Sequence, residues 1–298
     1  MKRLASVDIG SNTVHALVAD VDGSQLVDVA HYSEMPELGP HVAKHGEIGA
    51  AQAPAIAALK RVVDEAREHK FEHLVAGATA AVRTASDGAE FAEKAGQAIG
   101  VPMRILKEEK EAHLTFAGAA SKHAGKREWL LTDLGGGSME VVIGRDHELQ
   151  KWATLHIGSG VLSAQFLSDP PTSDERAKLR REALRLLRGA PDADVERVVA
   201  TGGTAVHLPS VLSRQNPPPV LTTADLLKCA EKLDESPADH LAKHLDLELP
   251  RVKALRGGVE VLLLLLDWYG QSNLQISREG VRHGMLLAYL KHGEDWWR

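Results

Sequence analysis

Two stretches of the chain place an aspartate at the end of an apolar run and follow it with glycine and small polar residues. Residues 4–20 read LASVDIGSNTVHALVAD, with Asp8, and residues 129–144 read WLLTDLGGGSMEVVIG, with Asp133. Glycine adopts positive φ readily, and a tight turn of this kind can present bare backbone N–H groups to an anion. Each stretch alone is compatible with an ordinary hairpin turn. Their repetition with an aligned aspartate favours a pair of phosphate-binding turns.

The spacing of the repeat predicts two similar domains. Asp8 and Asp133 lie 125 positions apart (133 minus 8), and His15 and Glu140 each follow seven residues later. A period this long indicates duplicated domains rather than a solenoid of short repeats.

Each hairpin is followed by a turn, a third strand pattern, and then alternating helix and strand patterns. We expect strands at 73–78, 102–106 and 196–200, and helices at 53–69, 87–98, 173–189, 223–233 and from about Thr204. Ser173 is the expected N-cap of its helix. The proline run within residues 215–226 predicts an irregular loop.

The composition excludes several classes of protein. The chain has 298 residues, a formal net charge of −6 and a single cysteine, Cys229. The negative charge disfavours nucleic-acid and membrane partners, and one cysteine allows neither an intramolecular disulfide nor a cysteine-rich zinc site. The longest apolar run, VLLLLL at 261–266, is far shorter than the ~20 residues of a membrane span and predicts a buried helix. We expect a cytoplasmic protein.

Six motifs occur in the order found in the exopolyphosphatase and guanosine pentaphosphate phosphatase family, which the chain resembles over almost its whole length. They are VDIGSNTVHALVAD (7–20), TAAVRTA (79–85), EKEAHLTFAG (109–118), TDLGGGSMEVVIG (132–144), ATGGTAVHL (200–208) and EGVRHGML (279–286). The resemblance implies an α/β protein of the actin-like ATPase superfamily, with two ribonuclease H-like domains and an active-site cleft between them. The implied domains are residues 1–117 and 118–282, with a C-terminal helix at about 283–298 that packs back on the first domain.

The same resemblance implies hydrolysis of a phosphoric anhydride by in-line attack of water. Glu111 matches the acidic residue of the family's Glu-Ala motif and is expected to orient or deprotonate the water. The adjacent Glu108 and Glu109 are interpreted as part of a solvated helix face. Arg83 matches a family arginine that would clamp terminal phosphate oxygens, although the residues alone favour a surface arginine.

The expected cofactor is Mg²⁺, with Mn²⁺ as an alternative. Asp133 lies at a strand end beside the GGGS turn, where a carboxylate can ligate a hard cation together with phosphate oxygens. Glu140 matches the acidic position that accompanies this aspartate in the family, and it could fold back across the hairpin to the same ion. The other interpretation of Glu140 is a solvated strand face.

The expected substrate contacts come from the two hairpin turns and from a helix start, where backbone N–H groups form an anion site. They are Ser11, Asn12, Thr13, Gly135, Gly136, Gly137, Ser138, Gly203 and Thr204. The alternative for the last two is a simple strand–helix turn. His113 stands where many family members have arginine, which predicts weaker or pH-dependent phosphate binding.

The leading hypothesis is therefore an exopolyphosphatase that removes terminal phosphate from linear inorganic polyphosphate. One alternative is a guanosine pentaphosphate 5′-phosphohydrolase, and a more distant one is an ATP-binding kinase or ATPase of the same superfamily. A non-catalytic phosphate-binding regulator is disfavoured because Glu111 is present. The expected partners are polyphosphate or guanosine pentaphosphate, with no nucleic acid and no membrane, and a homodimer is left open.

Overall fold

The computed structural model describes residues 2–212 and 220–298. The chain divides into two compact units, each with its own sheet and hydrophobic core. Unit 1 comprises Met1–Lys122 together with Glu279–Arg298, and unit 2 comprises His123–Arg278.

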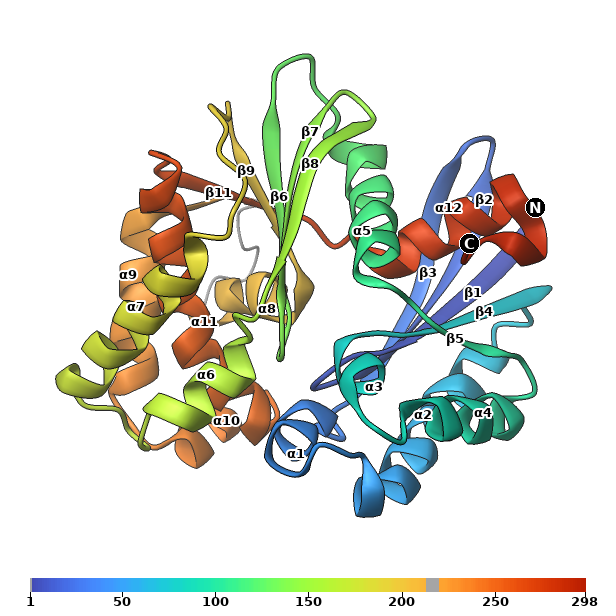
Figure 1. Cartoon of the computed structure of the whole chain (residues 1–298), viewed down its shortest axis with the longest axis horizontal. Helices are drawn as coiled ribbons and strands as arrows, with labels where there is room; N and C mark the ends of the chain where they lie inside the picture. Colours follow the sequence, from blue (N-terminus) through green and yellow to red (C-terminus); the bar gives the residue numbers. More distant parts are fainter. Residues whose placement is uncertain (1, 213–219) are drawn as a thin grey trace. The chain divides into compact units, whose positions relative to one another are not determined.

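The sheet of unit 1 has five strands in the order β3-β2-β1-β4-β5 (Figure 1). Strands β1 to β3 form an antiparallel meander, and β4 continues the sheet parallel to β1, with β5 parallel to β4. The strands are β1 Lys2–Ile9, β2 Val14–Asp22, β3 Gln25–Glu34, β4 His73–Ala78 and β5 Met103–Ile105. The helices that follow or connect them are α1 Leu38–His45, the 3-10 turn η1 Gly49–Ala51, α2 Gln52–Arg67, α3 Ala80–Thr84, α4 Gly88–Ile99 and α5 Glu108–His123.

Two hydrophobic clusters cover the two faces of this sheet. Val7 of β1 packs in a cluster with Leu59 of α2, whereas Leu4 belongs to a second cluster with Met285. Odd and even residues of a strand point to opposite faces, so helices must lie on both sides. The second face is covered by α12, Val281–His292, which the 3-10 turn η2, Gly293–Asp295, follows. Figure 1 shows α12 in red beside the blue strands.

Helices α5 and α12 meet without side chains between them. A Cβ on Gly118 would lie 2.2 Å from the carbonyl oxygen of Gly280, and one on Gly284 would lie 1.8 Å from that of Leu114. Only glycine fits at these two positions. The limit at 117/118 expected from the sequence falls inside α5, and the domain limits stay a prediction.

The sheet of unit 2 has six strands in the order β10-β11-β9-β6-β7-β8. They are β6 Trp129–Leu134, β7 Met139–Arg145, β8 Glu148–Leu155, β9 Val198–Thr201, β10 Val220–Thr222 and β11 Asn273–Ile276. The helices are α6 Ser159–Phe166, α7 Ser173–Leu187, α8 Gly202–Val211, α9 Thr223–Asp234, α10 Ala238–Leu245 and α11 Leu249–Trp268.

The two sheets share one strand order, which confirms the expected α/β fold with two related sheets. The run β3-β2-β1-β4 in unit 1 corresponds to β8-β7-β6-β9 in unit 2. Asp8 pairs with His15 in the β1–β2 register, and Asp133 pairs with Glu140 in the β6–β7 register. The repeat found in the sequence is therefore also a repeat in the pairing of the strands.

The structure corrects two local expectations. The N-cap of α7 is Thr172, not Ser173, because the Thr172 hydroxyl accepts from the Glu175 N–H in a capping box. The segment 215–226 is not wholly irregular before its helix, because β10 pairs antiparallel with β11. The proline run itself, at 217–219, lies outside the described residues.

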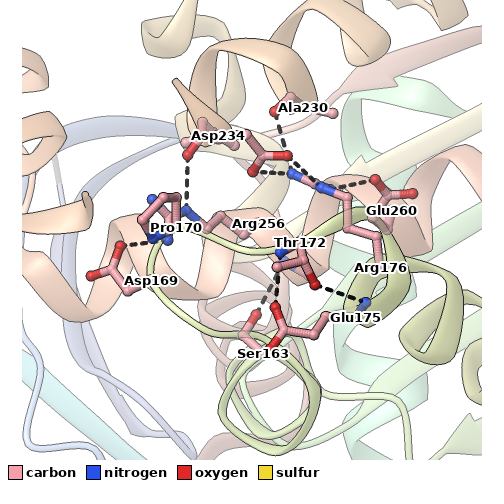
Figure 2. Close-up of polar contacts among 12 residues, drawn as sticks. Ser163, Asp169, Pro170, Thr172, Glu175, Arg176, Ala230, Asp234, Arg256 and Glu260 are labelled. Carbon is pink, nitrogen blue, oxygen red and sulfur yellow. Dashed lines mark hydrogen bonds and ion pairs between the residues drawn. The ribbon is translucent and has the colours of Figure 1, made fainter. Parts of the chain in front are cut away.

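Helix α11 is the central helix of unit 2, and the VLLLLL run lies buried within it as expected. A network of charged side chains, of which Arg256 and Glu260 are buried, joins it to α7 and α9 (Figure 2). Arg176 of α7 bonds Asp234 and Glu260, and Arg256, only 1% exposed, bonds Asp169 at 2.7 Å. Burial raises the pKa of Asp169, but the hydrogen bonds from Arg256 and the Ala238 amide outweigh it, and the pKa is lowered. Arg176 thus links α7 to both α9 and α11, whereas Arg256 links α11 to the segment before α7.

No helix in the described part of the chain is both long and apolar enough to span a membrane.

Candidate active site

The GGGS turn of unit 2 is held by its carbonyl groups. The N–H groups of Ser159 and Gly160, at the start of α6, donate to the carbonyl oxygens of Gly135 and Gly136 at 2.9 and 3.1 Å. In a trans peptide the C=O and the following N–H point in opposite directions. The N–H groups of Gly136 and Gly137 therefore point away from α6. Along the described chain they donate no hydrogen bond, so they are available to an anion.

The GSNT turn of unit 1 is built in the same way. The Gly39 N–H donates to the Ser11 carbonyl oxygen at 2.5 Å, and the Glu37 N–H donates to that of Asn12 at 3.1 Å. By the same trans-peptide geometry the N–H groups of Asn12 and Thr13 point the other way. They too donate no hydrogen bond within residues 2–212 and 220–298. Each unit thus carries one turn with outward-facing amides.

The close approach that fixes the GGGS turn depends on a glycine that sequence reasoning missed. A Cβ on Gly158 would lie 2.2 Å from the carbonyl oxygen of Gly136 and 2.4 Å from the Cα of Gly137. The segment HIGSG around it carries no recognisable motif, because the requirement arises from a contact between separate segments.

Asp133 and Glu140 lie directly opposite each other in the antiparallel β6–β7 pair. Opposed residues place their side chains on the same face of a sheet, and two like charges in this position destabilise the pair. Glu140 is 3% exposed, which rules out the solvated-face interpretation. Two carboxylates on one face fit a divalent cation, since Mg²⁺ is commonly bound by one or two carboxylates and completes its shell with water and phosphate oxygens. The described residues contain no cluster of three or more metal-ligating side chains.

The start of α8 lies beside Asp133. Gly202 has φ +86°, which favours glycine, and a Cβ there would lie 2.3 Å from Asp133 Oδ1. Thr204 is buried against α11, where a Cβ on Gly258 would lie 2.5 Å from its Cγ2. The ATGGTAVHL motif therefore serves to bring a helix N-terminus next to the carboxylate.

Arg251 of α11 is a further candidate that the sequence did not single out. It is 6% exposed, and a Cβ on Gly203 would lie 2.2 Å from its Nη1. Among the residues that the structure describes, it makes no hydrogen bond or ion pair, and burial lowers its pKa. His207 donates to the Gly203 carbonyl oxygen at 2.7 Å, and burial followed by the charge of Arg251 lowers the pKa of His207. A buried cation beside a helix N-terminus can hold an anion.

In unit 1 the structure brings Arg83 and Glu111 together. Arg83 Nη1 lies 2.6 Å from Glu111 Oε2 and also donates to the Leu106 carbonyl oxygen at 2.8 Å. Glu111 is 7% exposed, whereas Glu109 is exposed and Glu108 lies 3.8 Å from Arg83. Burial therefore distinguishes Glu111 from its neighbours. Arg83 is not the surface arginine that its sequence context favours.

Asp8 has a partner that no local sequence pattern indicates. Arg282 Nη1, at the start of α12, lies 2.8 Å from Asp8 Oδ1. Burial raises the pKa of Asp8, and the charge and hydrogen bond of Arg282 oppose that rise only in part.

His113 is exposed, and its Nδ1–H donates to the Glu109 carbonyl oxygen one turn earlier.

The predicted site residues thus fall into two sets, one in each unit. Unit 1 holds the GSNT turn with Ser11, Asn12 and Thr13, and the Arg83–Glu111 pair. Unit 2 holds Asp133, Glu140, the GGGS turn with Gly135, Gly136, Gly137 and Ser138, and the α8 start with Gly203 and Thr204.

These features define an α/β protein of two units, each with a turn whose backbone amides donate no hydrogen bond in the described structure, and comparison with known proteins identifies its family. The model of the Ppx/GppA phosphatase family matches residues 17–292. The chain belongs to this family of phosphatases.

Three relatives illustrate the match. A guanosine-5'-triphosphate,3'-diphosphate pyrophosphatase of Vibrio vulnificus is 26% identical over 295 residues, which cover 96% of this chain and 58% of that protein. The chain therefore spans less than two thirds of the length of that curated relative. The Ppx/GppA family member of Aquifex aeolicus has a crystal structure with 26% identity and a TM-score of 0.80, and the match covers 98% of this chain and 99% of that one. An exopolyphosphatase of Cytophaga hutchinsonii shares the fold with a TM-score of 0.88 at 20% identity, covering 97% and 98% of the two chains.

Proposed function

We propose that the protein is a Mg²⁺-dependent exopolyphosphatase that hydrolyses the terminal phosphate of linear inorganic polyphosphate. The observation that carries the proposal is the pair of turns whose carbonyls are tied to a following segment and whose amides face outward. Such amides suit a repeating chain of phosphate groups, because they recognise oxyanions without requiring a base or a sugar.

The carboxylates and the cations divide the remaining tasks. Asp133 and Glu140 would hold Mg²⁺, or Mn²⁺ as the alternative, which when bound neutralises phosphate charge. The α8 start with Gly203 and Thr204, together with Arg251, offers a further place for a phosphate group. Phosphoryl transfer depends mainly on such positioning and charge compensation.

Glu111 is the proposed general base. Its carboxylate is buried and bonded to Arg83, which holds one of its oxygens in place, and a positioned carboxylate can accept a proton from water. Arg83 has a second assignment, because its buried Nε donates no hydrogen bond in the described structure. We assign Arg83 to orienting Glu111 and to binding a phosphate oxygen when substrate is present.

A second candidate is hydrolysis of the 5′ phosphate of guanosine pentaphosphate. It is supported by the name of the Vibrio vulnificus relative, and the match to that relative covers 96% of this chain. The same two turns and carboxylates would serve it. The candidates differ in whether a nucleoside is needed for binding.

The deciding experiment measures phosphate release from long-chain polyphosphate and from guanosine pentaphosphate, side by side, with and without Mg²⁺. Faster release from polyphosphate, dependent on Mg²⁺ and lost in Glu111→Gln, is the expected result. Release from guanosine pentaphosphate alone would replace the first candidate with the second. Release from neither substrate would reject both.

A further inference from the structure

The two aspartates that mark the repeat have different neighbours. Across β6–β7, Asp133 faces a second carboxylate, whereas the matching neighbour of Asp8 across β1–β2 is His15. Asp8 is instead bonded to Arg282, whose Nη1 lies 2.8 Å from its Oδ1. In unit 1 the aspartate is therefore paired with an arginine side chain, whereas in unit 2 the aspartate faces a second carboxylate.

The charge on Asp8 bears directly on the GSNT turn. A Cβ on Gly10 would lie 3.9 Å from Asp8 Oδ2, so the carboxylate sits at the base of the turn. Asp8 is also buried, which removes most of the water that could screen it. An uncompensated carboxylate here would repel a phosphate bound to the amides of Asn12 and Thr13.

Packing fixes the backbone from which Arg282 reaches Asp8. The Ser6 hydroxyl donates to the Arg282 carbonyl oxygen at 3.1 Å, which ties the start of α12 to β1. Gly284, two residues on, lies against the backbone of Leu114 in α5. Because α5 also carries Glu111, the ion pair is built into the same framework as the proposed base.

Arg282 uses only one of its guanidinium nitrogens in this way. Within the described ranges its Nε and Nη2 donate no hydrogen bond, and Nε is buried. A buried donor without a protein acceptor can donate to an oxygen of a bound ligand or water.

We propose that Arg282 is a positioning residue that neutralises Asp8, so that the GSNT turn accepts a phosphate group without a metal ion of its own. The inference rests on the proposed hydrolysis of phosphate chains and adds a residue to its binding step. It makes a specific claim about charge. Removing Arg282 should weaken phosphate binding, and removing the charge of Asp8 as well should restore it.

The test compares wild type with Arg282→Gln, Arg282→Lys and the double variant Arg282→Gln/Asp8→Asn. KM and kcat are measured with polyphosphate and Mg²⁺, and the Kd of inorganic tripolyphosphate is measured by calorimetry. We expect Arg282→Gln to raise KM and Kd by at least about tenfold, because like charges placed together cost affinity. The change in kcat should be smaller. Arg282→Lys should lose less affinity, since it keeps the charge.

The double variant separates charge compensation from packing. Return of Kd toward the wild-type value supports the proposal, and a double variant as weak as Arg282→Gln overturns it. A folded Arg282→Gln with unchanged Kd overturns it as well. If Arg282→Gln does not fold, the Kd of the double variant alone decides the question. A value near that of wild type supports the proposal, and a value at least about tenfold higher overturns it. Wild type that binds tripolyphosphate but hydrolyses neither substrate would reject the proposed function while leaving the binding comparison intact.

Discussion

Glu140 lies directly across the β6–β7 pair from Asp133, with both side chains on one face of the sheet. Two like charges directly opposed on one face of a sheet repel each other, and a divalent cation between them would relieve that repulsion. The equivalent pair in unit 1, Asp8 and His15, lacks the second carboxylate. Because of this difference, we assign the proposed metal ligands to unit 2.

Asp133→Asn removes one ligand and one negative charge. We expect kcat for phosphate release to fall by at least about 100-fold, because a lost metal ligand removes charge stabilisation that the substrate needs. Added Mg²⁺ should not restore it. Normal activity with an unchanged Mg²⁺ dependence would disprove the ligand assignment.

Glu111→Gln keeps the size of the side chain and removes the proton acceptor. Positioned base catalysis contributes ~10²–10⁴-fold, so kcat should fall by that amount with little change in the Kd of tripolyphosphate. Glu109→Gln is the matched control, because Glu109 lies on the same helix turn but is exposed. It should stay near wild-type activity. Loss of phosphate release in Glu109→Gln, together with normal release in Glu111→Gln, would show that Glu111 is not the general base.

Gly158→Ala tests how the GGGS turn is held. The added Cβ would lie 2.2 Å from the carbonyl oxygen of Gly136, so the turn or the start of α6 must move. Overpacking of this kind costs about 1–3 kcal/mol of stability. We expect tripolyphosphate to bind more weakly and the melting temperature to drop. Unchanged affinity in a stably folded variant would mean that the turn does not depend on this contact.

Glu175 gives a pH-dependent contribution to stability. Its carboxylate accepts hydrogen bonds from the Thr172 amide and the Ser168 hydroxyl, which lower its pKa to about 2. A lowered folded-state pKa means that the contribution is complete above the unfolded value of about 4.5 and is lost as pH falls toward about 2. Glu175→Gln should therefore be less stable than wild type at pH 6, and the two should converge at pH 2.

Asp174→Asn is the control for this comparison. Asp174 is exposed and, in the part of the chain that the structure describes, accepts no hydrogen bond in the capping box. Urea unfolding at several pH values gives the free energies. A difference between Glu175→Gln and wild type that persists unchanged at pH 2 would contradict the lowered pKa.

The backbone pattern of this protein could be predicted from the sequence because its signals are local. The Asp-Gly turns, the alternation of strands and helices and the duplication all leave traces within short windows. Errors occurred where neighbouring residues are equally suitable. Thr172 and Ser173 are both good N-caps, and only the contact with Glu175 decides between them.

The residues missed by sequence reasoning act across long separations. Asp8 and Arg282 lie 274 positions apart, and Gly203 and Arg251 meet only through packing of α8 near α11. No periodicity or spacing rule reports such contacts. Glu111 lies between these two cases. The family resemblance distinguished it from the nearby Glu108 and Glu109, and its burial in the structure supplies a physical reason for that choice.

Unit 1 consists of two segments, one before and one after unit 2 in the sequence, and they are therefore synthesised at different times. While a ribosome is still translating residues 123–278, the residues of β1 to β5 have been made but those of α12 have not. Asp8 at that stage has no guanidinium beside it, and the face of the sheet around Leu4 is uncovered. Closure of the first unit over this face therefore requires that the inserted unit has already been synthesised.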